Sequence, residues 1–209
     1  MQEEVEKQRE YYEKTAAHYD DACCFDPNDE HHFACAALSG LLRHYHVESV
    51  LDVGCGTGRA IDRLKTHHPE ISFTGLEPVK ALRDLAVEKG ITAETLLDGD
   101  ATKLPFPDGA FDCVMMFGVL HHIPNASDAV AEALRVAAKM VFISDHNIYG
   151  MGSRWTRLGK QLFRDLGLRA PLRRIMTGGK GYHDTDWDGV FYPFSLIDHV
   201  QRIRKETVK

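Results

Sequence analysis

The sequence predicts an α/β protein in which helices cover both faces of a doubly wound, mostly parallel sheet. Three observations support this. Five short apolar segments alternate with helical segments from residue 49 to 144, a glycine-rich turn follows the first, and acids lie at or just after the ends of the first three. Short apolar runs separated by helices are typical of parallel strands buried on both faces. Right-handed crossovers between them give a doubly wound sheet.

The elements are expected in a regular order along the 209 residues. The apolar and β-branched runs predict strands at 49–53, 72–76, 94–97, 112–116 and 140–144. Helix-forming, break-free segments predict helices at 3–19, 33–45, 59–67, 79–89 and 126–138. The polar, proline-containing segment 20–32 is expected to be a loop.

These elements divide the chain into three parts of one domain: a helical cap over 1–45, the sheet-forming core over 46–145, and a basic segment with a C-terminal helix over 146–209. One or two basic amphipathic helices are expected within 154–176. After Ser144 only residues 206–209 could begin another strand. The sheet edge beyond the fifth strand is therefore expected to be incomplete, through truncation or because it is covered in another way, and an open edge favours a homodimer.

The charge is distributed unevenly. The chain has a net charge of −6. Residues 151–180, which we call the basic segment, have a net charge of +7, so the remainder has −13. This balance argues against nucleic-acid binding by the whole surface. Five cysteines without a C-x-x-C pair, a charged N-terminus and no long apolar run predict a cytoplasmic protein without disulfides, signal peptide or membrane span.

The glycine-rich turn is the most informative stretch. Asp52 at a strand end precedes Gly54, Cys55, Gly56 and Gly58. Glycine permits a sharp turn and close approach of a ligand to the backbone, and the following helix offers free N–H groups. The spacing is G-x-G-x-G, whereas dinucleotide sites usually have G-x-G-x-x-G. The spacing therefore disfavours, without excluding, an NAD-binding oxidoreductase.

Two further acids follow the next strands. Glu77 directly follows the second strand, where a carboxylate can accept hydrogen bonds from both hydroxyls of a ribose. Asp100 follows the third strand and can accept a hydrogen bond from an adenine amino group. In a doubly wound sheet these positions meet at one edge, so the sequence predicts a nucleoside site there.

With these residues in place, the sequence resembles the class I S-adenosylmethionine (SAM)-dependent methyltransferases, especially the small-molecule subgroup close to the ubiquinone/menaquinone-type enzymes. The resemblance covers about residues 10–145 and is carried by VLDVGCGTG (50–58), GLEP (75–78), GDATKLPFPDGAFDCVMMFGVLHHIPN (99–125) and MVFIS (140–144). It implies a Rossmann-like fold, SAM as cofactor and methyl transfer. The motifs are specific for the superfamily and do not identify the acceptor.

The resemblance also implies residue roles. The glycine loop would contact the methionine part of SAM, Glu77 would hold the ribose, Asp100 and the Ala101 backbone would contact the adenine, and Phe117 would border the methionine end. A tyrosine of the N-terminal helix would close over the cofactor, with Tyr19 the best match. The predicted cofactor site comprises Tyr11, Tyr19, Asp52, Gly54, Cys55, Gly56, Gly58, Glu77, Pro78, Asp100, Ala101 and Phe117.

Methyl transfer depends mainly on proximity and alignment, with a base needed when a hydroxyl acceptor loses its proton. Candidates after the fourth and fifth strands are His122, Asp145 and His146, since imidazole titrates near neutral pH. No metal site is predicted: adjacent histidines, as in His121–His122, are expected to diverge, and no Cys/His cluster occurs. An Asp145–His146 site would be weak.

The basic segment is expected to be either a solvated face or a lid that attracts a small anionic acceptor, with O-methylation of a sugar or natural-product type favoured. Alternatives are a tRNA or protein methyltransferase, for which the segment would be the docking patch, and a SAM-binding partner subunit without turnover. Aromatic side chains that suit a ring acceptor, a core or a dimer interface lie in or after it: Trp155, Tyr182, Trp187, Phe191 and Tyr192.

Overall fold

The computed structural model describes residues 2–22, 30–186, 188–200 and 203. Its main sheet has five parallel strands in the order β3-β2-β1-β4-β5. The strands are β1 (Ser49–Val53), β2 (Ser72–Leu76), β3 (Leu96–Leu97), β4 (Phe111–Phe117) and β5 (Ala137–Ser144). The predicted fold class is confirmed. The strand order reverses between β1 and β4, which is where doubly wound sheets form ligand crevices.

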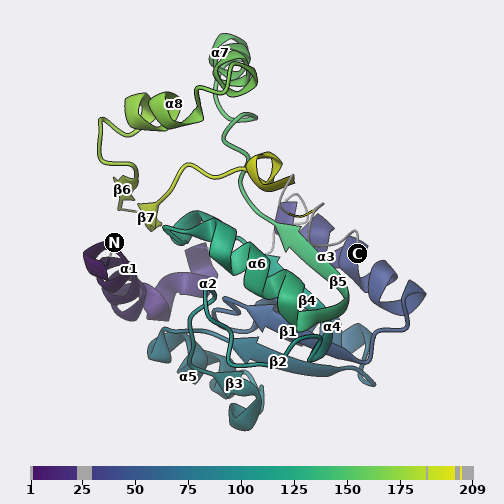
Figure 1. Ribbon diagram of the computed structural model, residues 1–209. Coiled ribbons are helices and arrows are strands. Elements are labelled where there is room, and N and C mark those ends of the chain that lie inside the picture. The colour runs from purple at the N-terminus through teal and green to yellow at the C-terminus, as the bar shows by residue number, and fades with distance from the viewer. Residues whose placement is uncertain (1, 23–29, 187, 201–202, 204–209) are drawn as a thin grey trace.

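Helices cover both faces of this sheet (Figure 1). The α-helices are α1 (Gln2–Thr15), α2 (Tyr19–Ala22), α3 (Glu30–His44), α4 (Arg59–His67), α5 (Lys80–Glu88), α6 (Ala126–Val136), α7 (Arg154–Asp165) and α8 (Arg169–Met176). Apolar residues of α3 and α4 pack on one face of the sheet, and those of α6 pack on the other. Because both faces are covered, the central residues of the strands are mostly apolar and buried.

Several element boundaries differ from the predicted ones. The helix expected over 3–19 ends at Thr15, and a 3₁₀ turn, Ala16–His18, connects it to α2. Helix α6 ends at Val136, and the next residue already pairs with Phe111 of β4. The third strand has only two residues, because the 3₁₀ turn Ala93–Thr95 occupies the first half of the expected segment.

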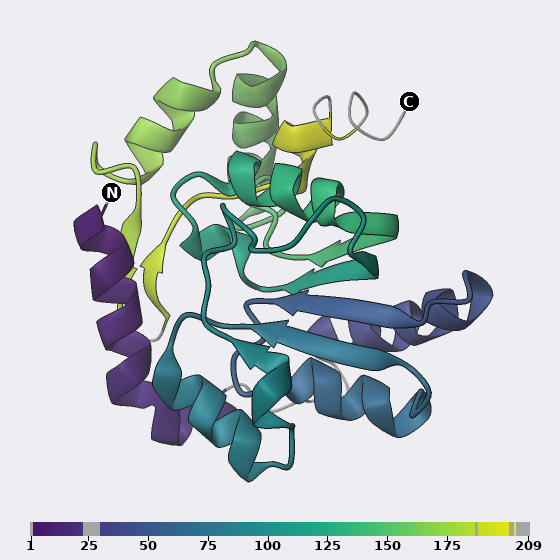
Figure 2. The ribbon, with the colours of Figure 1, turned by 60° about the horizontal axis from the view of Figure 1, so that its bottom comes forward.

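Helix α1 runs along the carboxyl ends of the strands, between α5 and a small hairpin (Figure 2). This hairpin, β6 (His183–Thr185) and β7 (Gly189–Phe191), is antiparallel and was not predicted. The backbone N–H of Val190 donates to the Gln8 side chain, and Ala16 packs against Val79 and Leu82. The N-terminal segment is therefore fixed by contacts at both ends.

Helices α7 and α8 stand away from the sheet, beyond the carboxyl end of β5 (Figure 1). The two expected basic helices are thus present. Within the described ranges, no strand pairs with the outer edge of β5. Residues 206–209, Cys23, Cys24 and Trp187 lie outside the described residues.

Candidate functional site

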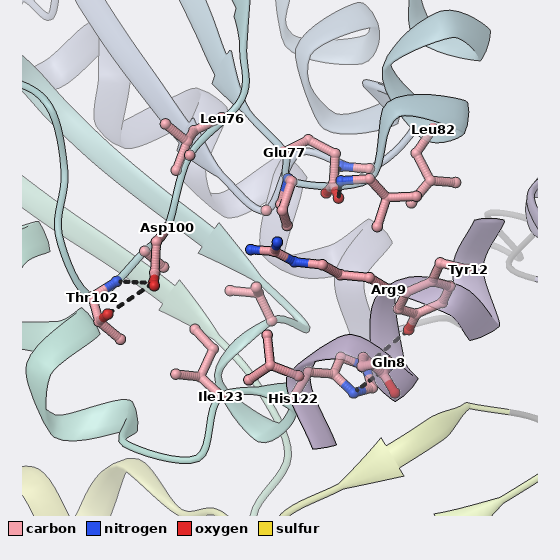
Figure 3. Close-up of a pocket in the computed structure, with 18 of the residues that line it drawn as sticks. Gln8, Arg9, Tyr12, Leu76, Glu77, Leu82, Asp100, Thr102, His122 and Ile123 are labelled. Carbon is pink, nitrogen blue, oxygen red and sulfur yellow. Dashed lines mark hydrogen bonds between the residues drawn. The ribbon is translucent and has the colours of Figure 1, made fainter. Parts of the chain in front are cut away.

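A pocket of about 590 Å³ lies between α1 and the carboxyl ends of β1, β2 and β4. Figure 3 shows side chains entering it from these elements, with Glu77 and Asp100 on the sheet side and Arg9 and Tyr12 on the helix side. This volume is in the range of sites for small molecules and cofactors. The pocket lies at the position where the strand order reverses, so the topology accounts for its place.

Glycine is needed at the three positions of the turn for different structural reasons. Gly54 and Gly56 line the pocket. Gly54 has φ +75°, and a Cβ there would stand 2.4 Å from Val119 Cγ2. Gly58 does not line the pocket, and a Cβ there would stand 2.0 Å from Ile91 Cδ1. The first two glycines bring the backbone to the pocket surface, whereas the third permits packing of the loop on α5 and its flank.

Glu77 is only 6% exposed, although its carboxylate borders the pocket. Oε2 accepts a hydrogen bond from Gly56 N at 3.0 Å, and Oε1 accepts one from Val79 N at 2.9 Å. Burial raises the pKa of this carboxyl, and the two backbone hydrogen bonds oppose that rise. Each oxygen has a second lone pair, so the carboxylate can still accept two hydrogen bonds from a ligand.

Asp52 lies beneath the glycine loop and does not line the pocket. It is 2% exposed, and its Oδ1 has no hydrogen-bond partner among the described residues. Burial, together with the charge of Glu77, raises the pKa of this carboxyl to about 8. Cys55 is also buried behind the loop, so both residues support the loop from below.

The remaining predicted cofactor residues divide into two groups. Those that line the pocket are Tyr19, Pro78, Asp100, Ala101 and Phe117. Asp100 keeps its loop in place by accepting hydrogen bonds from the backbone and hydroxyl of Thr102, both at 2.8 Å. Tyr11 points elsewhere, donating to Asp186 O at 3.2 Å.

Five residues of α1 line the pocket, and none of them was among the predicted site residues: Val5, Glu6, Gln8, Arg9 and Tyr12. Tyr12 takes the place expected of Tyr11, because it is Tyr12 that faces the sheet. Arg9 extends into the pocket between Glu77 and Asp100 (Figure 3), and its positive charge counteracts the raised pKa of Glu77. No motif marks Arg9, since its place depends on how α1 docks.

Of the three predicted catalytic residues, only His122 lines the pocket. Its Nδ1 lies 2.8 Å from Val190 O, so this nitrogen carries the proton that the carbonyl accepts. The Gln8 amide nitrogen, 2.9 Å from the same Nδ1, donates to the Asp188 carbonyl at 3.1 Å. Nε2 lies 2.9 Å from the Tyr12 hydroxyl, which donates to Asp188 Oδ1 at 3.1 Å.

His121 lies behind His122 and is 3% exposed. Its Nδ1 is 2.7 Å from Asp145 Oδ1, and its Nε2 is 3.4 Å from Asp188 Oδ2. Burial disfavours the charged imidazole, but these two carboxylates outweigh it and raise the pKa of His121 to about 9. The pKa of Asp145 and that of Asp188 are correspondingly held well below their usual range, despite burial. His121 is therefore an imidazolium at neutral pH.

The other two predicted catalytic residues lie beside His121, Asp145 with a buried carboxylate and His146 with a partly exposed ring. Asp145 accepts hydrogen bonds from Leu120 N and His146 N, both at 2.7 Å, in addition to its contact with His121. His146 packs its ring against Phe191, 5.4 Å between centroids. Neither borders the pocket. The arrangement assigns them to the support of His121 and His122.

The expectation that adjacent histidines diverge was wrong for this pair. The 3₁₀ turn Leu120–His122 brings the rings of His121 and His122 to 4.0 Å between centroids. Two sets of ligand atoms within 4.8 Å could hold a metal ion: His121, His122 and Asp188, and His121, Asp145 and His146. A protonated His121 between two carboxylates accounts for the same distances without a metal.

The basic segment does not line the pocket. Arg173 and Arg174 instead border a separate hollow of about 320 Å³, together with Arg169. The pocket lining itself holds four carboxylates, Glu6, Glu77, Asp100 and Asp128, and one guanidinium, Arg9. Helix α1, not the basic segment, forms the wall opposite the sheet.

Comparisons with known proteins agree with this geometry. Residues 51–142 match the family described as the methyltransferase domain. Similar proteins include ajmaline N-methyltransferase of Rauvolfia serpentina, 35% identical over 43% of this chain and 32% of that one. A ubiquinone/menaquinone biosynthesis C-methyltransferase of Pseudomonas paraeruginosa is 34% identical over 42% of this chain and 36% of that one. The chain thus spans about a third of the length of these curated relatives.

Solved structures share the architecture. A SAM-dependent methyltransferase of Thermotoga maritima, described as a possible histamine N-methyltransferase, superposes with a TM-score of 0.58. It is 18% identical, and the alignment covers 95% of this chain and 80% of that chain. This likeness establishes the fold, while the matched domain contains the glycine loop, Glu77 and Asp100. Residues 51–142 therefore resemble the methyltransferase domain in sequence, and the chain shares the Rossmann-like fold of the Thermotoga maritima structure.

Proposed function

We propose that the chain transfers the methyl group of SAM to a small acceptor bound beside His122. One observation carries the proposal: a single pocket combines the glycine loop, Glu77 and Asp100 with His122, whose Nε2 lies 2.9 Å from the Tyr12 hydroxyl. The first three suit a nucleoside cofactor, and the histidine suits proton removal. The relatives methylate different kinds of acceptor, so the acceptor has to be argued from this pocket.

The pocket residues fit SAM. Glu77 keeps two lone pairs for the vicinal hydroxyls of a ribose, and Asp100 offers an acceptor for an amino group. Gly54 and Gly56 would let the methionine part lie against the backbone, and a Cβ at Gly56 would stand 3.4 Å from the Tyr19 hydroxyl. Tyr19 therefore lies over the glycine loop, as a side chain closing on the cofactor would.

SAM supplies a methyl group activated by a positively charged sulfur. The chain must align the acceptor with that methyl group and take up the proton that the acceptor loses. His122 Nε2 can accept it, either directly or through the Tyr12 hydroxyl at 2.9 Å. Asp188 Oδ1, 3.4 Å from Nε2, would then stabilise the charged ring. A hydroxyl is a weak nucleophile until its proton is removed, so a base at this position favours O-methylation.

The charge of the pocket bears on the acceptor. With four carboxylates and one arginine, its lining favours an acceptor whose reactive part is uncharged. The anionic acceptor that the basic segment suggested gains no support from the lining. An anionic group of the acceptor would have to remain outside the pocket, near α7 and α8.

The test has two stages. SAM and its demethylated product should each raise the melting temperature, because they bind the native state, whereas NAD should not. A shift with NAD and none with SAM would overturn the assignment. Turnover is then measured as label transferred from methyl-labelled SAM to hydroxyl-bearing small molecules and lipid extracts.

The His122→Gln variant separates binding from chemistry. Its Kd for SAM should stay within about threefold of the wild-type value. Its methylation rate should fall by a factor of about 10²–10⁴, which is the usual contribution of a general base. An unchanged rate would refute the role of His122. Loss of SAM binding alone would place His122 in the cofactor site.

A further inference from the structure

Helix α7 turns its apolar side away from the protein. Four large apolar residues recur at helical spacing on one face of this helix, and their exposed fractions are high: Trp155 80%, Leu158 51%, Leu162 58% and Leu166 63%. A surface helix of a globular protein normally directs such a stripe to the core. Each of these four side chains exposes at least half of its surface, so the stripe is available to a partner.

The opposite side of α7, which carries Phe163 and two basic residues, faces the protein, and Phe163 packs against the cluster of Ile148, Tyr149 and Leu172. Lys160 Nζ donates to the carbonyls of Ile148 and Met151, at 2.6 and 2.8 Å. The guanidinium of Arg164 lies 5.2 Å from the centre of the Tyr149 ring. These contacts fix the rotation of α7 about its own axis. The outward direction of the apolar stripe therefore follows from specific contacts on the opposite side of the helix.

The segment that carries this stripe is also rich in cations. Five basic side chains of the segment form no ion pair with any residue that the structure describes: Arg154, Arg157, Arg173, Arg174 and Lys180. Arg169, Arg173 and Arg174 line the separate hollow of about 320 Å³. A guanidinium binds phosphate through two parallel hydrogen bonds. The hollow therefore suits a phosphate-bearing head group.

We propose that α7 and α8 dock on an anionic lipid bilayer. The apolar stripe would enter the boundary between head groups and acyl chains, and the unpaired cations would meet the lipid phosphates. None of the described helices is long and apolar enough to cross a bilayer, so the contact would lie in the plane of the surface. A second copy of the chain is a poorer occupant, because it would bring two segments of +7 together.

The docking surface is connected to the site already described. The chain enters the segment from Asp145 and His146 and leaves it through Asp188 and Phe191, and these four residues surround His121. A bilayer bound at α7 and α8 would therefore lie near the catalytic end of the pocket. This placement favours an acceptor held in or at the membrane, but docking itself does not depend on the proposed methyl transfer.

The test is sedimentation of the full chain with vesicles. The wild type should bind vesicles of phosphatidylcholine mixed with phosphatidylglycerol at least about tenfold more tightly than phosphatidylcholine alone, and salt should weaken binding because it screens exposed charges. In a Trp187→Phe background, the fluorescence of Trp155 should shift to shorter wavelength on binding. Failure of the wild type to bind anionic vesicles would overturn the proposal.

Matched variants identify the surface. The double variant Leu158→Asp/Leu162→Asp should lose vesicle binding at least about tenfold with an unchanged melting temperature and unchanged SAM affinity. The control is Val87→Asp, an exposed apolar residue of α5 that is 42% exposed, which should bind like the wild type. Equal binding by the double variant would refute the role of the stripe.

Two further outcomes would also overturn the proposal. If light scattering shows a dimer that the double variant loses, and vesicles bind neither protein, the stripe is an interface between copies. If inorganic phosphate raises the melting temperature of the wild type but not that of Arg173→Gln/Arg174→Gln, and vesicles bind neither protein, the arginine hollow is a site for free phosphate.

Discussion

Replacing Glu77 by Gln tests the cofactor site most directly. The carboxylate accepts hydrogen bonds from Gly56 N at 3.0 Å and Val79 N at 2.9 Å. Alanine would leave both buried donors unpaired, so a loss of stability would mask the loss of SAM affinity. Glutamine keeps one oxygen and turns its NH₂ group toward the other donor. One unpaired N–H should lower the free energy of unfolding by about 1–3 kcal/mol.

The same substitution should weaken SAM binding. Loss of hydrogen bonds to a charged group costs about 1.5–3 kcal/mol, which corresponds to about 10- to 150-fold in Kd. Isothermal calorimetry with SAM, below the melting temperature of the variant, measures this. Glu94→Gln is the control, since Glu94 is exposed and outside the pocket. If folded Glu77→Gln binds SAM within about threefold of the wild type, the ribose is not held by Glu77.

Three further predictions concern stability. Asp52 has a native pKa of about 8 against about 3.9 unfolded, so the native state binds a proton between these values and stability should fall as pH rises from about 4 to 8. Asp52→Asn should flatten that slope in urea titrations, and an equal slope would contradict the burial argument. His121 has a native pKa of about 9, so the stability from its charge should be complete below pH about 6.5 and vanish as pH rises through 9. His121→Gln should lack this alkaline loss, and if its alkaline profile matches the wild type, His121 does not hold the charge. Gly54→Ala combines a φ of +75°, costing about 1–2 kcal/mol, with a Cβ 2.4 Å from Val119 Cγ2. It should destabilise more than Gly90→Ala, where φ is +94° with open space, and the two melting temperatures decide.

Local sequence determined the core of the fold. The strands 49–53 and 72–76 and the helix 59–67 begin and end at the predicted residues. The strands are short apolar runs, the helix has amphipathic spacing, and all three are bounded by glycine or polar residues. Short apolar runs indicate strands buried on both faces, so strand and helix can be distinguished here. The G-x-G-x-G spacing and the acids after successive strands likewise placed Gly54, Glu77 and Asp100 at one edge, because the carboxyl ends of parallel strands meet there.

Only the tertiary structure decided which side chains reach the pocket. Tyr12 lines it and Tyr11 does not, because the choice depends on the rotation of α1 against a hairpin more than 170 residues away. Asp188 joins His121 and His122 through the same hairpin, whose strands of three residues are too short to show a period. The orientation of α7 also depends on tertiary contacts. Its sequence predicts a basic amphipathic helix, but only the contacts of Lys160 and Arg164 turn the apolar stripe outward. Periodicity fixes the relative positions of residues on one helix, and the direction that the helix faces is fixed by what packs against it.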